Sequence, residues 1–253
     1  MESRVKPQPG AESFVSRHHF VLVFGALLAF YVLTPIVQQL RPGLHPAVPP
    51  AVEAGLFLTL LLGTIVAVSK RRALTLFAML LAVAAGVLWL VGIVIDIDGV
   101  HVVRYVLLVG FLSYVIWVML RAIFDSRQVT FDTLCASLCI YLLLGLVWAP
   151  AYSAVDLLDP AAFTCTVETA KPRGWLRLGR GETAVLYFSF ATLTTLGYGD
   201  IVPTSPISRM LASIEAIAGQ LYLTVLVARL VGMHIAHSIG RQQARDREPG
   251  DGR

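Results

Sequence analysis

Long apolar runs dominate this chain and decide what it can fold into. Of its 253 residues, 57% are hydrophobic and only 14% are charged, and the mean hydropathy is +0.74. A soluble domain carries about 25% charged residues, so this chain lacks the polar surface of a water-soluble globule. A run of about 20 apolar residues is long enough to cross a bilayer as a helix. The sequence therefore predicts an integral membrane protein and excludes a soluble enzyme, a nucleic-acid-binding domain and a disordered chain.

Six apolar runs reach or approach the length of a membrane span, so the predicted fold class is an all-α integral membrane protein. The predicted spans are 20–37, 54–69, 73–95, 102–120, 131–149 and 206–237, and the fifth is expected to stop at Pro150. Between the last two lie a polar stretch at 151–180 and an apolar segment at 182–193 that is too short to span. An apolar segment of this length is typical of a re-entrant helix.

Basic residues set the predicted orientation. The Lys and Arg clusters of the first 17 residues, of 70–72 and of the carboxyl tail fall on one side of a six-span chain, and such clusters stay in the cytoplasm. We therefore expect a multi-pass protein of the cell (inner) membrane with both termini cytoplasmic. The net charge of +4 then reflects orientation in the lipid bilayer, and no nucleic-acid partner is expected.

The segment after the re-entrant helix carries the chemistry. Its residues are Thr194, Thr195, Leu196, Gly197, Tyr198, Gly199 and Asp200. Irregular backbone at membrane depth is tolerated only where protein or a water-filled cavity surrounds it, and glycines at alternate positions can adopt positive φ. A backbone that alternates between left- and right-handed conformations aims consecutive carbonyls the same way. Four copies around one axis would stack these oxygens into cages that replace the hydration shell of a cation.

The Thr-Thr-Leu-Gly-Tyr-Gly-Asp sequence at 194–200 resembles the selectivity filter of the tetrameric potassium channel superfamily. Its context agrees, because a span, an outer loop, a short helix, the filter and a final span follow one another over about 131–237. The resemblance implies a homotetramer, with six spans per subunit, that passes K⁺ without a cofactor or enzymatic activity. The implied K⁺ ligands are the carbonyl oxygens of Thr195, Leu196, Gly197 and Tyr198, with the Thr195 hydroxyl as the innermost ring and Gly199 closing the filter.

The resemblance also assigns supporting roles. Thr194 and Asp200 would support the filter, and Tyr187 occupies the position of an aromatic residue that hydrogen-bonds the filter aspartate. Gly219 falls at the hinge glycine of the inner helix, although small residues also allow membrane helices to pack closely. The chain departs from some relatives at Ala191, where they place a carboxylate behind the filter.

Two charged residues lie inside the last predicted span, where an ionisable side chain indicates a functional site. Glu215 is expected either to stabilise cations at the pore or to pair with a polar neighbour. Arg229 is expected near the cytoplasmic mouth, where it either tunes ion entry or contacts lipid headgroups. The fourth span has only Arg104 and Arg121, one at each end, whereas a voltage sensor needs many charges. Steep voltage gating is therefore not expected.

Other polar residues receive simpler interpretations. His234 and His237 share a helix face, and interfacial packing is expected there in preference to a proton or metal sensor. Cys165, in the outer loop, is expected to be a free thiol, with a disulfide between subunits as the alternative. The predicted domains are a cytoplasmic leader at 1–17, a four-helix peripheral membrane domain at 18–127, a pore domain at 128–240 and a short basic cytoplasmic tail at 241–253.

Three other functions compete with a potassium channel. Gly197 to Asp200 also fits the Gly-x-Gly-Asp pattern of intramembrane aspartyl proteases, but the second carboxylate that such an enzyme needs would have to be Asp96 or Asp98, at a helix end. A potassium transporter would carry four non-identical pore repeats, and this chain has one. A regulatory channel subunit that conducts nothing alone is the remaining alternative.

Overall fold

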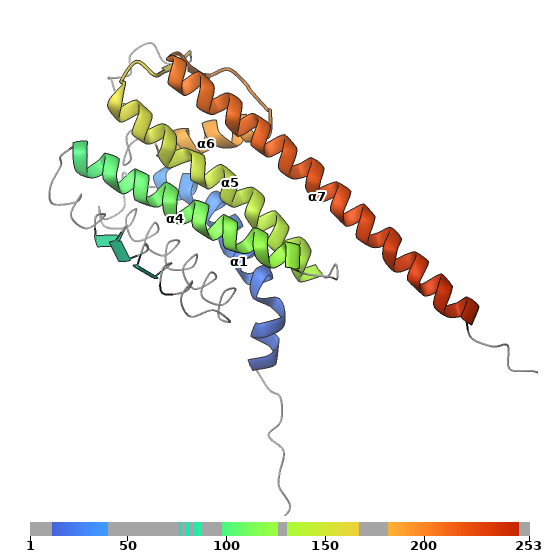
Figure 1. The fold of residues 1–253 in the computed structure, drawn as a ribbon. Coiled ribbons are helices and arrows are strands. Elements are labelled where there is room, and N and C mark those ends of the chain that lie inside the picture. Colours follow the sequence, from blue (N-terminus) through green and yellow to red (C-terminus); the bar gives the residue numbers. More distant parts are fainter. Residues whose placement is uncertain are drawn as a thin grey trace, which may run out of the picture.

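The computed structural model is mostly helical, as the predicted fold class requires (Figure 1). It describes residues 12–39, 98–125, 131–166 and 182–247, with a few positions between 76 and 87. In chain order its elements are α1 (Glu12–Gln39), α4 (Asp98–Asp125), α5 (Phe131–Leu158), β1 (Phe163–Cys165), α6 (Glu182–Leu193), β2 (Ile201–Pro203) and α7 (Pro206–Arg247). The predicted second span and most of the third lie outside the described residues.

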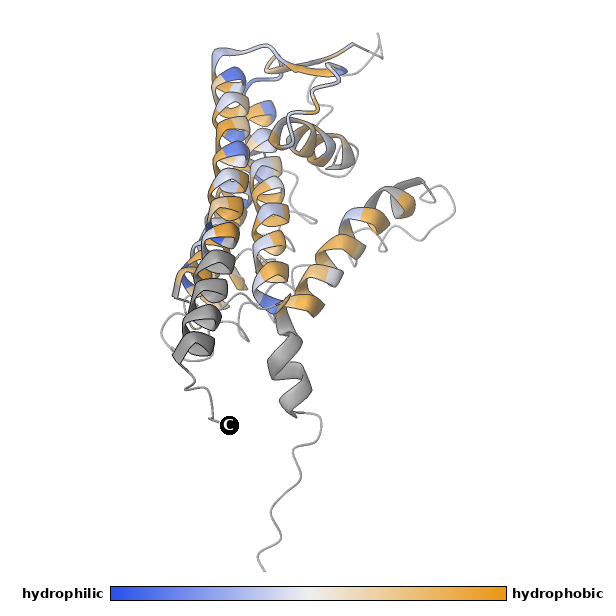
Figure 2. Cartoon of the chain, turned by 90° about the vertical axis from the view of Figure 1, so that its right-hand side faces the viewer, coloured by the Kyte–Doolittle hydropathy of each residue, from blue (hydrophilic) through white to orange (hydrophobic). Residues whose placement is uncertain are grey.

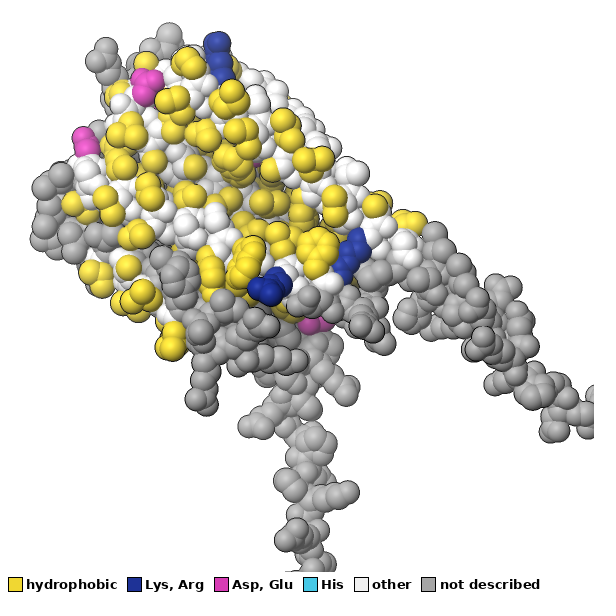
Figure 3. All heavy atoms as spheres, in the orientation of Figure 1, with side chains coloured by type: hydrophobic (Ala, Val, Ile, Leu, Met, Phe, Trp, Pro, Cys, Tyr) yellow, Lys and Arg dark blue, Asp and Glu magenta, His cyan; other side chains and the backbone are white. Residues whose placement is uncertain are grey.

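Three stretches among the described residues are long and apolar enough to cross a membrane. They are Asp98–Phe124, Phe131–Leu158 and Pro206–Arg229, and α1 and α6 contain the shorter apolar stretches Phe20–Leu33 and Ala184–Leu193. Figure 2 shows hydrophobic residues along these helices. On the face seen in Figure 3, hydrophobic side chains fill the middle and charged ones lie toward its upper and lower margins. This distribution suits a protein that is surrounded by lipid at mid-height.

Helix α5 does not stop at Pro150, as the sequence predicted, but continues through it to Leu158. Proline lacks a backbone N–H, so it leaves one carbonyl of the preceding turn without its helical partner. Membrane helices tolerate this loss because neighbouring groups contact the freed backbone. Here the turn beyond Pro150 is also held by Tyr152, which is completely buried and hydrogen-bonded to α7.

Two other helices extend beyond their predicted spans. Helix α1 begins at Glu12, so the end of the predicted leader at 1–17 is helical. Helix α7 runs to Arg247, so the first residues of the predicted tail at 241–253 continue the last helix. Lys, Arg and Gln are good helix formers, which explains why the helix continues past the apolar region.

The core of the membrane-spanning region is formed by α1, α4 and α5. Only residues 126–130 separate α4 from α5, and a connection this short makes the two helices antiparallel neighbours. Phe111 and Val115 of α4 are buried in one apolar cluster with Ile140 and Leu143 of α5, and Leu27 of α1 joins the same cluster. The three helices lie together in Figure 1, and α7 packs along α5, with Glu215 bonded to Tyr152 and Tyr222 bonded to Ser137.

A second apolar cluster lies beneath the re-entrant segment. The rings of Tyr152, Phe163 and Phe188 pack edge to face, with centroids 5.0 to 5.7 Å apart. They come from α5, β1 and α6 respectively, so the cluster fixes the short helix to the two elements that precede it in the sequence. Strand β1 pairs antiparallel with β2, with Thr164 opposite Val202. This ribbon joins the chain on either side of α6 and the segment that follows it.

Candidate functional site

The predicted filter has an alternating backbone. Thr195, Gly197 and Gly199 have φ of +58°, +54° and +78°, whereas no residue between them has a positive φ. The sequence analysis expected left-handed conformations at the two glycines but not at Thr195. A left-handed residue other than glycine costs about 1–2 kcal/mol, so the surrounding structure must hold it in place.

The backbone amides of this segment are bound to the end of α6. The Leu196 amide donates to the Ala191 carbonyl at 2.8 Å, and the Gly197 amide donates to the same oxygen at 3.2 Å. The Thr195 amide donates to the Thr192 carbonyl at 3.0 Å. The last carbonyls of a helix have no partner within the helix, and here the filter amides satisfy two of them. The strained segment is thereby docked onto the carboxyl end of α6.

The carbonyl oxygens of residues 195–198 accept no hydrogen bond from any residue that the structure describes. The residues that carry them are exposed in the isolated chain, with exposed fractions of 52% for Leu196 and 73% for Tyr198. Polar backbone groups require a partner wherever water is excluded. Four successive carbonyl oxygens are thus available to coordinate a cation.

The row of available carbonyls ends at Gly199. The hydroxyl of Thr166 donates to the Gly199 carbonyl at 3.2 Å, and the Thr166 amide donates to the Asp200 carbonyl at 2.9 Å. Thr166 directly follows β1, so the ribbon places it beside the outer end of the filter. Sequence analysis missed this contact, because strands of three residues have no recognisable periodicity. Cys165 is a free thiol of intermediate exposure in this strand, opposite Ile201.

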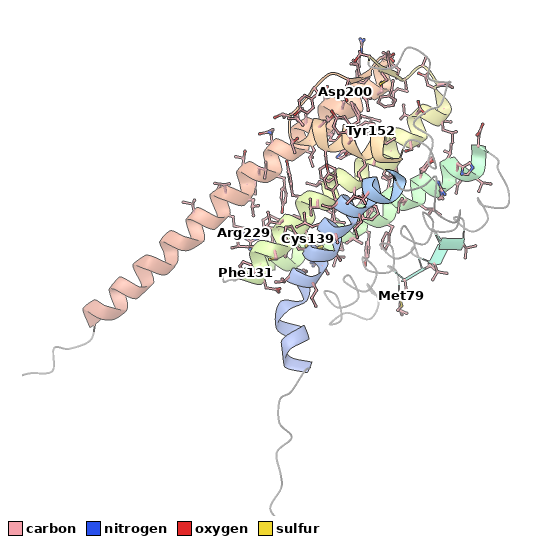
Figure 4. All side chains as sticks on the ribbon, turned by 180° about the vertical axis from the view of Figure 1, so that it is seen from behind. Met79, Phe131, Cys139, Tyr152, Asp200 and Arg229 are labelled. Atoms are coloured by element: carbon pink, nitrogen blue, oxygen red, sulfur yellow. The ribbon has the colours of Figure 1, made fainter. Side chains whose placement is uncertain are left out.

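Tyr187 and Asp200 form the hydrogen bond that the resemblance implied. The Tyr187 hydroxyl donates to Asp200 Oδ1 at 3.1 Å, which connects the middle of α6 to the residue that follows the filter. Figure 4 shows Asp200 at the same end of the molecule as Tyr152. The role of this pair as a support of the filter stays a prediction.

The Tyr187–Asp200 hydrogen bond can be tested by a single substitution. We expect Tyr187→Phe to lower K⁺ flux through reconstituted protein several-fold, because a hydrogen bond worth about 1 kcal/mol then no longer holds the outer end of the filter. The matched control is Tyr141→Phe, because the Tyr141 ring packs 6.2 Å from Tyr222 and its hydroxyl has no hydrogen-bond partner among the described residues. Equal flux through both variants would contradict the assigned role.

Helix α6 is wedged between α5 and α7 at two glycines. A Cβ at Gly145 would lie 2.6 Å from the ring of Phe190, and a Cβ at Gly219 would lie 2.5 Å from the Leu193 carbonyl oxygen. Both distances are shorter than side chains tolerate. The structure therefore gives Gly219 a packing role against the end of α6, and its role as a hinge stays a prediction.

Glu215 does not line a pore, which corrects one of the two expectations for it. Its side chain is completely buried within the subunit, between α5, α6 and α7. The Tyr152 hydroxyl donates to its Oε2, and Ser189 Oγ lies 2.5 Å from its Oε1. The alternative that Glu215 pairs with polar neighbours describes the structure. Sequence analysis could not identify these neighbours, which lie 63 and 26 residues away along the chain.

Arg229 has contacts with another helix that neither expectation included, and its role at the pore mouth or the headgroups stays a prediction. Its guanidinium donates to the Ile123 carbonyl in the last turn of α4 and lies 4.9 Å from the centre of the Phe124 ring. The carbonyl end of a helix attracts a cation, so Arg229 connects α7 to the end of α4. The two arginines of α4 lie over aromatic rings of the same helix, Arg104 over Tyr105 and Arg121 over Trp117.

The contact of Arg229 with α4 predicts a loss of stability on substitution. Arg229→Met is expected to lower the free energy of unfolding by about 1–2 kcal/mol, because it removes a charged hydrogen bond and a cation–π contact between helices. Thermal unfolding in detergent measures the effect. Arg121→Met is the control, since Arg121 is exposed and its cation–π contact is with Trp117 of its own helix. An unchanged Tm for Arg229→Met would contradict a stabilising contact with α4 and would favour a role at the pore mouth or the headgroups.

Comparison with known proteins points to the same segment. Residues 178–235 match a family model described as an ion channel. The chain is also 39% identical over 64 residues to the two-pore potassium channel 1 of Arabidopsis thaliana. This match covers 25% of the chain and only 16% of that relative. No solved structure matches the chain.

The fold and these matches define a helical membrane protein with an ion channel domain. Residues 178–235 are thus similar to an ion channel family, and the match to a potassium channel supports a relation to the pore-loop potassium channel superfamily.

Proposed function

We propose that this chain is the subunit of a homotetrameric, K⁺-selective channel without steep voltage gating. The observation that carries the proposal is the row of four carbonyls at residues 195–198, which have no donors among the described residues and belong to an alternating backbone. In a tetramer these oxygens, with the Thr195 hydroxyl, would surround a dehydrated K⁺ on a common axis. Gly199 and Asp200 would close the outer end.

An exposed apolar stripe on α7 supports assembly. Its members recur at helical spacing and are Ile207, Met210, Ile214, Ile217, Leu221 and Val225. Such an exposed apolar face is suited to contact with neighbouring subunits. Six spans, cytoplasmic termini, a location in the cell membrane, and a division into a peripheral domain at 18–127 and a pore domain at 128–240 complete the proposal.

The decisive experiment is ion flux through the purified full-length protein in liposomes. We expect K⁺ to pass far faster than Na⁺, and Ba²⁺ to block the flux. Native mass spectrometry of the same preparation should give a tetramer. A monomer that passes no ions would overturn the proposal. A tetramer that conducts only when co-assembled with another channel subunit would favour the regulatory alternative instead.

A further inference from the structure

A buried polar cluster lies behind the predicted filter and is centred on Glu215 of α7, whose carboxyl group is completely buried. Its members are Glu215, Tyr152 of α5, Ser189 of α6 and the backbone carbonyl of Gly145 in α5. The three side chains are each 0% exposed. No Lys, Arg or His among the described residues forms an ion pair with Glu215. A buried carboxylate without a cation is very costly in its ionised form.

The protonation of Glu215 can be deduced by counting the protons that these hydrogen bonds require. Ser189 Oγ lies 2.6 Å from the Gly145 carbonyl oxygen and 2.5 Å from Glu215 Oε1. A serine hydroxyl has one proton and can donate only one hydrogen bond. A carbonyl oxygen only accepts, so the serine proton is needed on the Gly145 side. The short contact between Ser189 Oγ and Glu215 Oε1 then requires a second proton, and only the carboxyl group can supply it.

We infer that Glu215 is a neutral carboxylic acid and a positioning residue for the pore helix α6. In this arrangement Tyr152 donates to Oε2, the protonated Oε1 donates to Ser189 Oγ, and Ser189 donates to the Gly145 carbonyl. Every polar group of the cluster is satisfied, and no charge is buried. The chain of hydrogen bonds runs from α5 through α7 and α6 and back to α5.

The hydrogen bonds of Ser189 in this cluster fix the position and rotation of α6 close to the residue that binds the filter amides. Ser189 lies two residues before Ala191, whose carbonyl holds the amides of Leu196 and Gly197. A shift of Ser189 would therefore move the anchor of the filter backbone. The protonation of Glu215 follows from the geometry of one subunit alone. Its effect on conduction rests on the proposed function.

Infrared difference spectroscopy tests the proton directly, on the full chain. The spectrum of the unmodified protein minus that of Glu215→Gln is expected to show the carbonyl stretch of a protonated carboxylic acid at neutral pH, shifted in D₂O. Subtraction of the variant isolates Glu215 from other carboxyl groups. A pair of carboxylate stretches in its place would overturn the inference, whether or not the protein conducts.

Ion flux tests the positioning role. Glu215→Gln keeps both the donor and the acceptor, so flux and K⁺ preference should stay within about twofold of the unmodified protein. Glu215→Met has a similar size but no hydrogen bonds, and its flux should fall about tenfold or more because Tyr152 and Ser189 lose their partners. Ser189→Ala, which breaks the same chain, should behave like the methionine variant and serves if that variant does not fold.

The outcomes separate the two proposals. Equal loss in the glutamine and methionine variants would show that a charge is required and would contradict a neutral Glu215. Full flux in the methionine and alanine variants would contradict the positioning role. If the unmodified protein passes no K⁺, the proposed function fails, while the infrared result still decides the proton on Glu215.

Discussion

Replacing Gly197 by alanine is expected to reduce K⁺ flux at least tenfold and to abolish the preference for K⁺ over Na⁺. Gly197 has φ +54°, and no described residue of the same chain other than its two sequence neighbours has an atom within 4 Å of the position of an added Cβ. The effect is therefore one of backbone strain and not of collision. A left-handed alanine costs about 1–2 kcal/mol, a tetramer carries this cost in all four subunits, and relaxation would turn a carbonyl away from the axis. Liposome flux with K⁺ and Na⁺ measures the change.

The matched control for this substitution is Gly110→Ala. Gly110 is a helical glycine of α4 with open space around it and no positive φ, so alanine should leave flux unchanged. Undiminished K⁺ preference in Gly197→Ala, with the protein folded and tetrameric, would show that the filter lies elsewhere in the chain.

Replacing Gly219 by alanine is expected to lower the free energy of unfolding by about 1–3 kcal/mol, the usual cost of overpacking, and to reduce K⁺ flux as well. The added Cβ would meet the Leu193 carbonyl oxygen at 2.5 Å and the Leu193 side chain at 2.8 Å. Backbone cannot move aside as a flexible side chain does, so the end of α6 must shift. The filter amides are bound to this end, and the disturbance therefore reaches the filter.

The sign of the stability change distinguishes packing from a hinge. Alanine favours a helix over glycine by about 1 kcal/mol, so a glycine that served only as a hinge would give a more stable protein on substitution. Gly232→Ala provides the reference, because Gly232 lies in the same helix with nothing within 4 Å. Thermal unfolding should show a lower Tm for Gly219→Ala and an equal or higher Tm for Gly232→Ala. A raised Tm in both variants would contradict the packing role and favour Gly219 as a hinge.

The parts that the sequence predicted are those that depend on local chemistry. Long apolar runs predicted the helices, and the alternate glycines predicted positive φ at Gly197 and Gly199. Thr195 was missed because a β-branched residue gives no local reason to be left-handed, whereas the hydrogen bonds of its own amide and of the next two amides to the end of α6 hold it in place. Pro150 shows the opposite error, since a reliable local stop signal is overridden by the buried contacts of Tyr152.

The partners of the charged residues of α7 could not be predicted from the sequence. Position within an apolar span indicated that Glu215 and Arg229 have partners or a function, but not which. The partners of Glu215 come from two other helices, and the carbonyl bound by Arg229 lies 106 residues earlier in the chain. Contacts between residues so far apart depend on how helices pack, and helical periodicity alone contains no information about this.

The β1–β2 ribbon makes the segment that follows β1 a suitable site for insertions. Because Phe163 is paired with Pro203 and Cys165 with Ile201, the ribbon fixes the chain just before residue 167, and α6 begins again at Glu182. The entropy of closing a loop changes by only about 0.6 kcal/mol when its length doubles. We therefore expect that residues can be added to or removed from 167–181 without displacing the ribbon, and under the proposed topology an epitope tag or a fluorophore site inserted there would be accessible from outside the cell.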